Sequence, residues 1–367
     1  MIRLLDCTLR EAPVKNLAFG EKLITDFITG LENSKLDVIE VGFLKNGTYL
    51  PGSTIFSRTE QIEPYLKNKK TGVLYVALVD FGRFDLENLS PYNGKSIDGI
   101  RICFKKHERE QVICFAEEIK KKGYKIFIQC VDSLGYDEQE LRTFIQKVNI
   151  LEPYAFSIVD TFGGMYLDDV ERIYSLVSQE LDAQICLGFH GHNNLLLANS
   201  NAQYFISRAK NERREIMVDT SMMGCGRGAG NAHSELLAEY LNKFCGCSYN
   251  MEAILDLLYS IMPQILKQAE FGYSIPYFLS GKNQSHVFNV DYLKKYGDTM
   301  YEPVDGATTK DAEGEILQGY TEQSNVNVVR EMVDMITITR AYEASQKVIH
   351  SYDSMLDKSV NQVGALK

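Results

Sequence analysis

The chain has 367 residues, a formal net charge of −10 and an apolar fraction of 45%. That apolar fraction supplies a real core and argues against global disorder, while the negative charge argues against a general nucleic-acid binder. No run of 18 uncharged apolar residues and no signal-like N-terminus occur, so we expect no membrane span and a cytoplasmic protein whose eight cysteines are reduced thiols.

Apolar runs of strand length recur at helix-sized intervals along the first two thirds of the chain. They are Ile2–Asp6, Asp37–Phe43, Gly72–Val79, Gly99–Phe104, Lys125–Val131, Ala155–Asp160, Gln184–His190 and Glu215–Asp219. Most are continuous rather than alternating, which is typical of parallel strands covered on both faces. Amphipathic stretches between them predict helices at Glu108–Lys122, Asp137–Val148 and Asp168–Glu180. Eight strand–helix units over roughly 240 residues predict an α/β fold, a (β/α)8 TIM barrel, with a doubly wound open sheet as the alternative.

Polar side chains stand at or near the carboxyl end of every predicted strand, where the active sites of such barrels lie. They are Glu11, Glu40, Asp80, Arg101, Gln129, Asp160, His190 with His192, and Asp219. Of these, Glu40, Arg101 and Asp160 are predicted to bind substrate. Any single member of the set could instead cap a helix or a turn, but the recurrence on all eight strands favours a site.

Two segments far apart in the chain look like the halves of one divalent-metal site. Residues 5–11 (LDCTLRE) end in an arginine beside a carboxylate, and residues 188–194 (GFHGHNN) place two imidazoles two residues apart. In extended backbone such a pair projects from one side, so both rings can hold one ion. The predicted ligands of a hard cation are Glu11, His190 and His192. With Arg10 beside it, such an ion would bind and polarise a 2-oxo acid.

A glycine-rich stretch, residues 224–231 (GCGRGAGN), follows the eighth predicted strand and precedes a predicted helix at Ser234–Phe244. Glycines at alternate positions let backbone amides approach a ligand closely. The stretch is therefore a candidate anion-binding or metal-edge loop. Asn231 at its end is predicted to add a neutral oxygen ligand to the metal.

The character of the chain changes from about residue 289. A polar, irregular segment is followed at Val326–Val360 by apolar residues at three-to-four spacing, without proline or glycine, which predicts one long amphipathic helix. The predicted domains are thus a barrel at 1–248, short post-barrel helices at 249–290 and a tail with the long helix at 291–367. That helix either packs on the barrel or serves as an assembly or coiled-coil helix.

The barrel part resembles the metal-dependent lyases and synthases related to HMG-CoA lyase, the DRE-TIM metallolyases, and within them the 4-hydroxy-2-oxovalerate aldolase type. The matching segments are residues 6–11 (DCTLRE), 39–43 (IEVGF), 159–164 (VDTFGG), 188–194 (GFHGHNN), 224–231 (GCGRGAGN) and 271–277 (FGYSIPY). The resemblance implies that Glu11 ligates the metal with His190 and His192. It also implies that Arg10 steadies an enolate oxygen and that Thr161 lies near the substrate carboxylate.

This sequence departs from the aldolase pattern at two places. Those aldolases carry Asp-Gly after the arginine, whereas Glu11-Ala12 stands here. Glutamate at this position resembles the homocitrate-synthase branch. Some also carry a histidine base shortly afterwards, whereas residues 13–15 are PVK. The base therefore stays unassigned among Lys15, Tyr273 and a water on the metal. Cys225, near the place of a catalytic cysteine in HMG-CoA lyases, is interpreted as a small loop residue.

The tail resembles an unrelated family, the flagellar rod and hook basal-body proteins, and among them the distal rod. The resemblance rests on residues 316–329 (ILQGYTEQSNVNVV), 332–336 (MVDMI) and 340–343 (RAYE). We therefore expect a fusion of an aldolase-like barrel with a rod-like tail. Residues 325–363 would provide the contact with a flagellar rod or coiled-coil partner.

The leading functional prediction is a metal-dependent aldolase that acts on a small 2-oxo acid with Mn²⁺ or Mg²⁺ and forms a homo-oligomer. One alternative is a Claisen-type synthase that joins an acyl-CoA to a 2-oxo acid, favoured by Glu11. The other is a flagellar basal-body or assembly protein in which the barrel is a passenger. The remaining histidines, His286 among them, are assigned surface or capping roles.

Overall fold

The computed structural model describes residues 1–12, 19–267, 271–287, 293–296 and 300–303. The chain divides into two compact units, Met1–Ala307 and Thr308–Lys367. The long helix predicted at Val326–Val360 and the partner segment 325–363 lie outside the described residues. The three-domain division predicted from the sequence stays a prediction.

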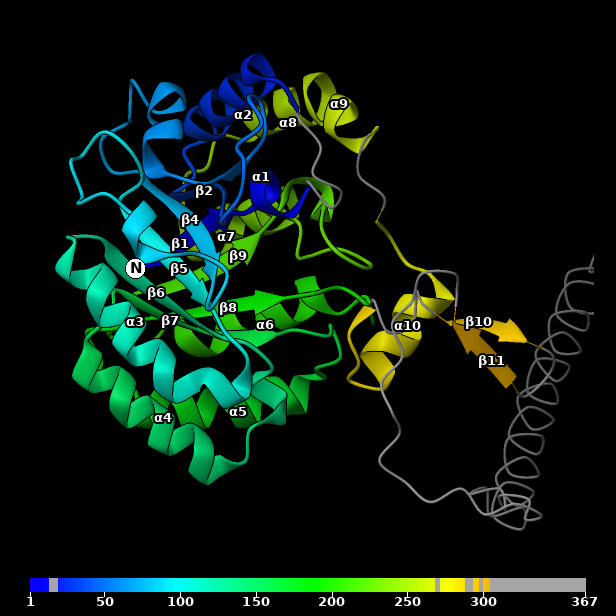
Figure 1. The fold of residues 1–367 in the computed structure, drawn as a ribbon. Coiled ribbons are helices and arrows are strands. Elements are labelled where there is room, and N and C mark those ends of the chain that lie inside the picture. Colours follow the sequence, from blue (N-terminus) through cyan, green and yellow to red (C-terminus); the bar gives the residue numbers. More distant parts are fainter. Residues whose placement is uncertain (13–18, 268–270, 288–292, 297–299, 304–367) are drawn as a thin grey trace, which may run out of the picture. The chain divides into compact units, whose positions relative to one another are not determined.

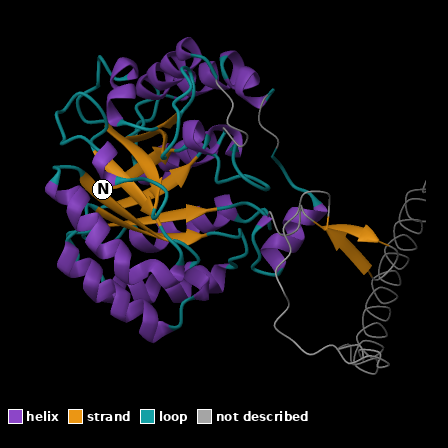
Figure 2. Ribbon diagram, viewed as in Figure 1, coloured by secondary structure: helices purple, strands orange, loops and turns teal. Residues whose placement is uncertain are grey.

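Eight parallel strands close into a barrel (Figures 1 and 2). They are β1 (Ile2–Asp6), β2 (Val38–Leu44), β4 (Leu74–Asp80), β5 (Gly99–Cys103), β6 (Lys125–Cys130), β7 (Ala155–Asp160), β8 (Cys186–Gly191) and β9 (Ile216–Thr220). Closure comes from β1, which pairs in parallel with β9 on one side and with β2 on the other. The predicted barrel is confirmed, and each predicted strand coincides with an observed one to within two residues at either end.

The helices lie outside the strands and cover the barrel (Figure 2). They are α2 (Glu21–Asn33), α3 (Arg109–Lys121), α4 (Glu138–Leu151), α5 (Leu167–Glu180), α6 (Ala198–Ala209) and α7 (Ser234–Cys245), while the short α1 (Thr8–Glu11) follows β1 at the carboxyl end of the barrel. After the barrel come α8 (Met251–Ser260), α9 (Met262–Leu266), α10 (Ile275–Lys282) and the antiparallel pair β10 (Leu293–Tyr296) and β11 (Met300–Pro303). Among the described residues, no helix is long and apolar enough to cross a membrane.

Two of the eight strands are not followed by an α-helix. Between β2 and β4 the chain forms a short ninth strand, β3 (Ile55–Phe56), parallel to β2, and two single-turn 3₁₀ helices. Between β4 and β5 it forms one such turn, Leu86–Asn88. Both connections contain proline and several glycines, residues that interrupt helices. The expected repeat of strand and helix is therefore incomplete in the second and third units.

The barrel interior is layered, because alternate residues of each strand point inward. An apolar cluster fills one part of the interior; most of its members stand near the amino ends of their strands, whereas Leu5 and Cys7 stand at the carboxyl end of β1. It comprises Leu5, Cys7, Val38, Val76, Phe127, Ala155, Cys186 and Met217. Two residues further along β8, Gly188 lies against Ser157, and two residues further still comes His190. The same alternation carries β5 from Gly99 to the buried Arg101, so polar side chains occupy the layers nearer the carboxyl ends.

Candidate metal centre

The structure brings the three predicted metal ligands together at the carboxyl end of the barrel. Glu11 closes α1, directly after β1, while His190 and His192 come from the end of β8. One ligand atom of each lies within 4.8 Å of the others. The Nε2 atoms of both rings are 4.0 Å from Oε1 of Glu11, and the three side chains are buried.

The hydrogen bonds of the two imidazoles orient their free nitrogen atoms toward Glu11. Nδ1 of His192 lies 3.0 Å from the backbone carbonyl oxygen of Asp160, which can only accept, so Nδ1 carries the proton. Nδ1 of His190 lies 3.0 Å from Oδ2 of Asp219. Each Nε2 therefore presents a lone pair to the same space, as in metal sites where an outer partner fixes the tautomer.

The charges at this point match a cation. Burial acts to raise the pKa of Glu11, but the neighbouring positive charge, Arg10 first, brings it down to about 2. Burial also lowers the pKa of His192 well below its usual range, and Arg227 adds to this shift. The carboxylate oxygen of Glu11 thus lies about 4 Å from an imidazole nitrogen of each histidine, and oxygen and imidazole nitrogen fit a divalent ion of the oxygen- and nitrogen-binding class.

Asn231 offers a further oxygen beside His192. The two residues form an isolated antiparallel bridge, and Nδ2 of Asn231 donates to the carbonyl of Cys225 at 3.1 Å. Its Oδ1, in contrast, is buried without a hydrogen-bond partner among the described residues. Because a buried polar atom is seldom left unpaired, this oxygen fits the role of an additional ligand.

The glycine-rich loop that carries Asn231 is anchored to the turn after β8. Asn193 N donates to the carbonyl of Gly230 at 2.8 Å, and Ala229 N donates to Oδ1 of Asn194 at 2.9 Å. Gly230 has φ +94°, and a Cβ there would lie 2.0 Å from the carbonyl oxygen of Gly224. Only glycine fits this position, and the tight fold fixes the loop against the two histidines.

A buried ion-pair network extends from Arg10 into the barrel. Arg10 pairs with Glu11 and, at 2.9 Å, with Oε2 of Glu40. The same Glu40 oxygen is 2.9 Å from Nη1 of Arg101, which also pairs with Asp219. The network thus runs from the arginine beside the metal ligands to the carboxylate that orients His190.

The residues predicted to bind substrate occupy different positions relative to this centre. The side chains of Glu40 and Arg101 are fully buried within the network. Asp160 is buried beneath the loop after β7, and its carboxylate accepts hydrogen bonds from the amides of Gly164 and Met165. Burial raises its pKa to about 7. Their part in substrate binding stays a prediction.

Thr161, predicted to lie near the substrate carboxylate, follows β7 at the carboxyl end of the barrel. Its Oγ1 accepts a hydrogen bond of 2.7 Å from the amide of Asp132, which follows β6. Of the residues considered as a base, Lys15 lies outside the described residues and Tyr273 is exposed. Burial raises the pKa of Cys225 to about 12, which matches the predicted role as a small loop residue.

Two further residues at this centre were not identified from the sequence. Arg227, in the glycine-rich loop, is half-buried, and its charge contributes to the lowered pKa values of Glu11 and His192. Nη1 of Arg227 lies 3.0 Å from Nε2 of His286, which comes from the segment after α10. Spacing gave no indication of this pair, because 58 residues separate the two in the sequence and neither belongs to the ligand set.

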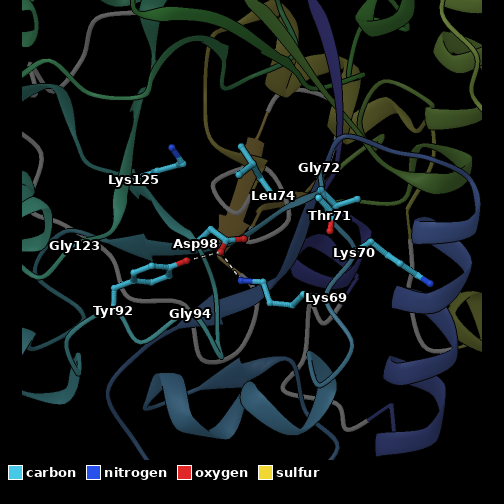
Figure 3. A pocket seen from close by; sticks show the side chains of 11 residues that line it. Lys69, Lys70, Thr71, Gly72, Leu74, Tyr92, Gly94, Asp98, Gly123 and Lys125 are labelled. Carbon is cyan, nitrogen blue, oxygen red and sulfur yellow. Dashed lines mark hydrogen bonds and ion pairs between the residues drawn. The ribbon is translucent and has the colours of Figure 1, made fainter.

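A surface groove lies at the opposite end of the barrel from the metal centre. Figure 3 shows this groove from close by. It is lined by residues at and before the amino ends of β4 and β6, among them Leu74 and Lys125. Lys69 and Tyr92 both contact Asp98 there. The chemistry of the candidate site lies at the carboxyl ends of the strands, as in other barrels of this class.

Comparison with known proteins gives two family matches. Residues 103–257 match the HMGL-like family, and residues 317–363 match the family described as flagellar basal body rod FlgEFG protein C-terminal. The chain is 30% identical over 254 residues to the 4-hydroxy-2-oxovalerate aldolase of Thermomicrobium roseum, covering 66% of this chain and 67% of that protein. It is 26% identical over 317 residues to the aldolase of the same name from Carboxydothermus hydrogenoformans, covering 79% and 89%.

A third relative is matched over a shorter stretch. The chain is 29% identical over 178 residues to the oxaloacetate decarboxylase of Mycobacterium tuberculosis; the match covers 48% of this chain and 49% of that protein, so about half its length. Among solved structures, the N-terminal domain of a proposed aldolase from Bacteroides vulgatus has a TM-score of 0.65 at 24% identity, covering 79% and 95%. The HMG-CoA lyase of Bacillus subtilis has a TM-score of 0.58 at 18% identity, covering 73% and 94%. These structures share the barrel fold; by its family match and its identity to the Thermomicrobium protein, the chain belongs to the HMGL-like family of lyases.

Proposed function

We propose that this protein is a divalent-metal-dependent aldolase that makes or breaks a carbon–carbon bond of a 4-hydroxy-2-oxo acid through a pyruvate-type enolate. One observation carries the proposal: a carboxylate oxygen of Glu11 and the Nε2 atoms of His190 and His192 converge on one space with their lone pairs. The aldolases named above, which match over much of the chain, support the choice of reaction.

The metal, when bound by these residues and Asn231, would act as a Lewis acid that polarises the 2-oxo group. Arg10 has its guanidinium held by Glu11 and Glu40, so it is fixed beside the ligand set before substrate arrives. A fixed cation of this kind stabilises negative charge on the enolate oxygen without reorganisation. Thr161 would bind the carboxylate of the 2-oxo acid.

Mn²⁺ or Mg²⁺ is the proposed ion. The donor set contains oxygen and imidazole nitrogen, and burial raises the pKa of the Cys225 thiol to about 12. Hard cations favour oxygen ligands, and imidazole extends the choice toward Mn²⁺.

Replacing both imidazoles tests the proposal. We expect the double variant His190→Ala, His192→Ala to lose Mn²⁺ affinity by at least about a hundredfold, because two ligands are removed. The exchange of pyruvate methyl protons with deuterated water, followed by NMR, should stop in the same variant and in wild-type protein treated with EDTA. His107→Ala, at an exposed position, is the matched control.

Unchanged Mn²⁺ affinity in the double variant would refute the metal site. The Claisen-type synthase is the alternative chemistry, since Glu11 stands where the aldolases of this type carry aspartate. Coenzyme A release from acyl-CoA in the presence of 2-oxo acids, without aldol cleavage, would favour that alternative.

We further propose that the segment matching the flagellar rod family is an assembly element fused to the enzyme, so that the chain forms a homo-oligomer or binds a rod-type partner. The match of residues 317–363 supports this role. Light scattering on the full chain and on a chain that ends at Ala307 tests it. A smaller oligomer after deletion supports the assembly role, and an unchanged subunit number contradicts it.

A further inference from the structure

Arg227 is a cation at the mouth of the barrel that the proposed reaction does not use. Within the described residues, no carboxylate oxygen lies within ion-pair distance of its guanidinium, whereas Arg10 pairs with Glu11 and Glu40. Its hydrogen-bonding partner there is Nε2 of His286, at 3.0 Å. The Arg227 side chain is half-buried, so its charge is partly removed from water without a direct ion pair among the described residues.

The position of Arg227 is imposed by the glycine-rich loop. The amide of Gly230 donates to the carbonyl of Arg227 at 3.1 Å, and Gly228 next to it has φ +68° and is held to Gly272 by a backbone hydrogen bond of 3.2 Å. The loop is anchored to Asn193 and the turn after β8, as described above. Arg227 is therefore presented on a fixed support, which is what a binding residue requires.

The charge of Arg227 interacts first with Glu11 and Arg10 at the ligand set, and then with the ends of β5 and β4. Its charge acts on Asp80, at the end of β4, and on Cys103, at the end of β5, as well as on Glu11. The carboxylate of Asp80 is itself 3.3 Å from Arg83. Thr161, the proposed partner of the 2-oxo acid carboxylate, follows β7. In the barrel, β6 separates β7 from β5 and β4.

We propose that Arg227, supported by His286, binds a second anionic group of the substrate and so selects 2-oxo acids that carry a carboxylate or phosphate at the end remote from the 2-oxo group. This inference rests on the proposed function for the placement of the 2-oxo acid head. Burial lowers the pKa of His286 to about 4, with Arg227 contributing. The neutral ring accepts a hydrogen bond from Arg227 and leaves the other guanidinium N–H groups for the anion.

Binding of matched 2-oxo acids to the full chain, without turnover, tests this inference. 2-Oxoglutarate and 2-oxopentanoate share the same head and differ in the terminal carboxylate, and 2-oxo-4-phosphonobutanoate adds the phosphonate arm. With saturating MnCl₂, isothermal titration should show at least about tenfold tighter binding of one of the two anionic ligands, as expected for a charge-assisted pair. The Arg227→Gln variant should bring that affinity ratio close to one, and Arg227→Lys should restore part of it.

Two outcomes would overturn the inference. One is a wild-type affinity ratio near one for both anionic ligands. The other is an equal loss of affinity for all three ligands in Arg227→Gln, which would place Arg227 on the shared head. The proton exchange of pyruvate tests the proposed function separately. If the protein prefers anionic 2-oxo acids but does not exchange pyruvate protons, only the aldolase reaction is refuted. If it exchanges pyruvate protons but shows no such preference, only this inference is refuted.

Discussion

At the scale of single residues, Asp6 shows how the first sequence motif is tied to the end of the barrel. Its Oδ1 accepts from the amide of Thr8 at 3.0 Å, and its Oδ2 accepts from the hydroxyl of Ser234 at 2.6 Å. Ser234 lies 2.7 Å from the hydroxyl of Thr220, which donates to the carbonyl of Leu5. Burial nevertheless raises the pKa of Asp6 to about 6, since these hydrogen bonds only partly offset the loss of water.

The raised pKa of Asp6 predicts a pH-dependent contribution to stability. The protonated carboxyl stabilises the folded state fully below the unfolded pKa of about 3.9, and this contribution is lost as the pH rises through about 6. Asparagine can keep every hydrogen bond, because its amide donates to Ser234, which then donates to Thr220. We expect Asp6→Asn to gain about 1 kcal/mol over wild type between about pH 5 and pH 7.5, measured by urea unfolding.

The control is Asp26→Asn, at a partly exposed position on α2. If the Asp6→Asn and wild-type unfolding free energies kept a constant difference across this pH range, Asp6 would titrate alike in folded and unfolded protein.

At the scale of elements, the loop of residues 224–231 borders the metal centre and is hydrogen-bonded to the turn after β8. It supplies both Asn231 and Arg227, and it folds tightly enough that Gly230 has no room for a side chain. Gly246, which ends α7, also has a positive φ, +69°, but a Cβ there would meet nothing within 4 Å. The two glycines therefore separate the effect of backbone strain from the effect of steric exclusion.

Alanine substitution of these two glycines should give different results. Gly246→Ala carries only the strain of a positive φ, about 1 kcal/mol of stability, and should leave Mn²⁺ affinity unchanged. Gly230→Ala must move the loop, because its Cβ would lie 2.0 Å from the carbonyl oxygen of Gly224, so Mn²⁺ affinity should fall by about tenfold or more. Equal Mn²⁺ affinities in the two variants, measured by titration, would show that loop geometry does not set the ligand positions.

The strands were predictable from the sequence because buried parallel strands leave continuous apolar runs. The convergence of Glu11 with His190 and His192 was predictable too, since the carboxyl ends of barrel strands meet at one mouth. The missing helices after β2 and β4 were not predicted, although glycine and proline in those connections carry the signal. The contact between Arg227 and His286 was not predicted, because it depends on how a glycine-rich loop and a post-barrel segment fold. Residue spacing does not encode that arrangement.

At the scale of the whole molecule, every side chain of the candidate site belongs to the first compact unit, Met1–Ala307. The ligands and the ion-pair network come from β1, β2, β5, β8, β9 and the loops that follow them, and His286 is the last contributor along the chain. The segment that matches the flagellar rod family starts at residue 317. Catalysis and assembly are therefore expected to be separable by truncation.

A chain that stops at Ala307 tests this separation. We expect its Mn²⁺ affinity and its rate of pyruvate proton exchange to stay within about twofold of the full chain, because no group of the site is removed. A chain that stops at Lys282 lacks His286 as well as the rod-like segment. We expect this shorter chain to lose its selectivity for anionic 2-oxo acids. A loss of exchange beyond tenfold in the chain ending at Ala307 would mean that the rod-like segment completes the enzyme.

The two imidazoles differ in what secures them. The ring of His190 is oriented by the carboxylate of Asp219, which Arg101 keeps charged. A single substitution at Asp219 or Arg101 can therefore remove the contact that orients this ring. His192 is secured by a main-chain carbonyl, that of Asp160, which every amino acid possesses. Random mutagenesis should therefore recover few metal-binding clones with replacements at Asp219, whereas replacements at Asp160 keep the acceptor of His192 and lose the carboxylate that holds the amides of Gly164 and Met165. The orientation of one of the two histidines is thus set by main-chain geometry.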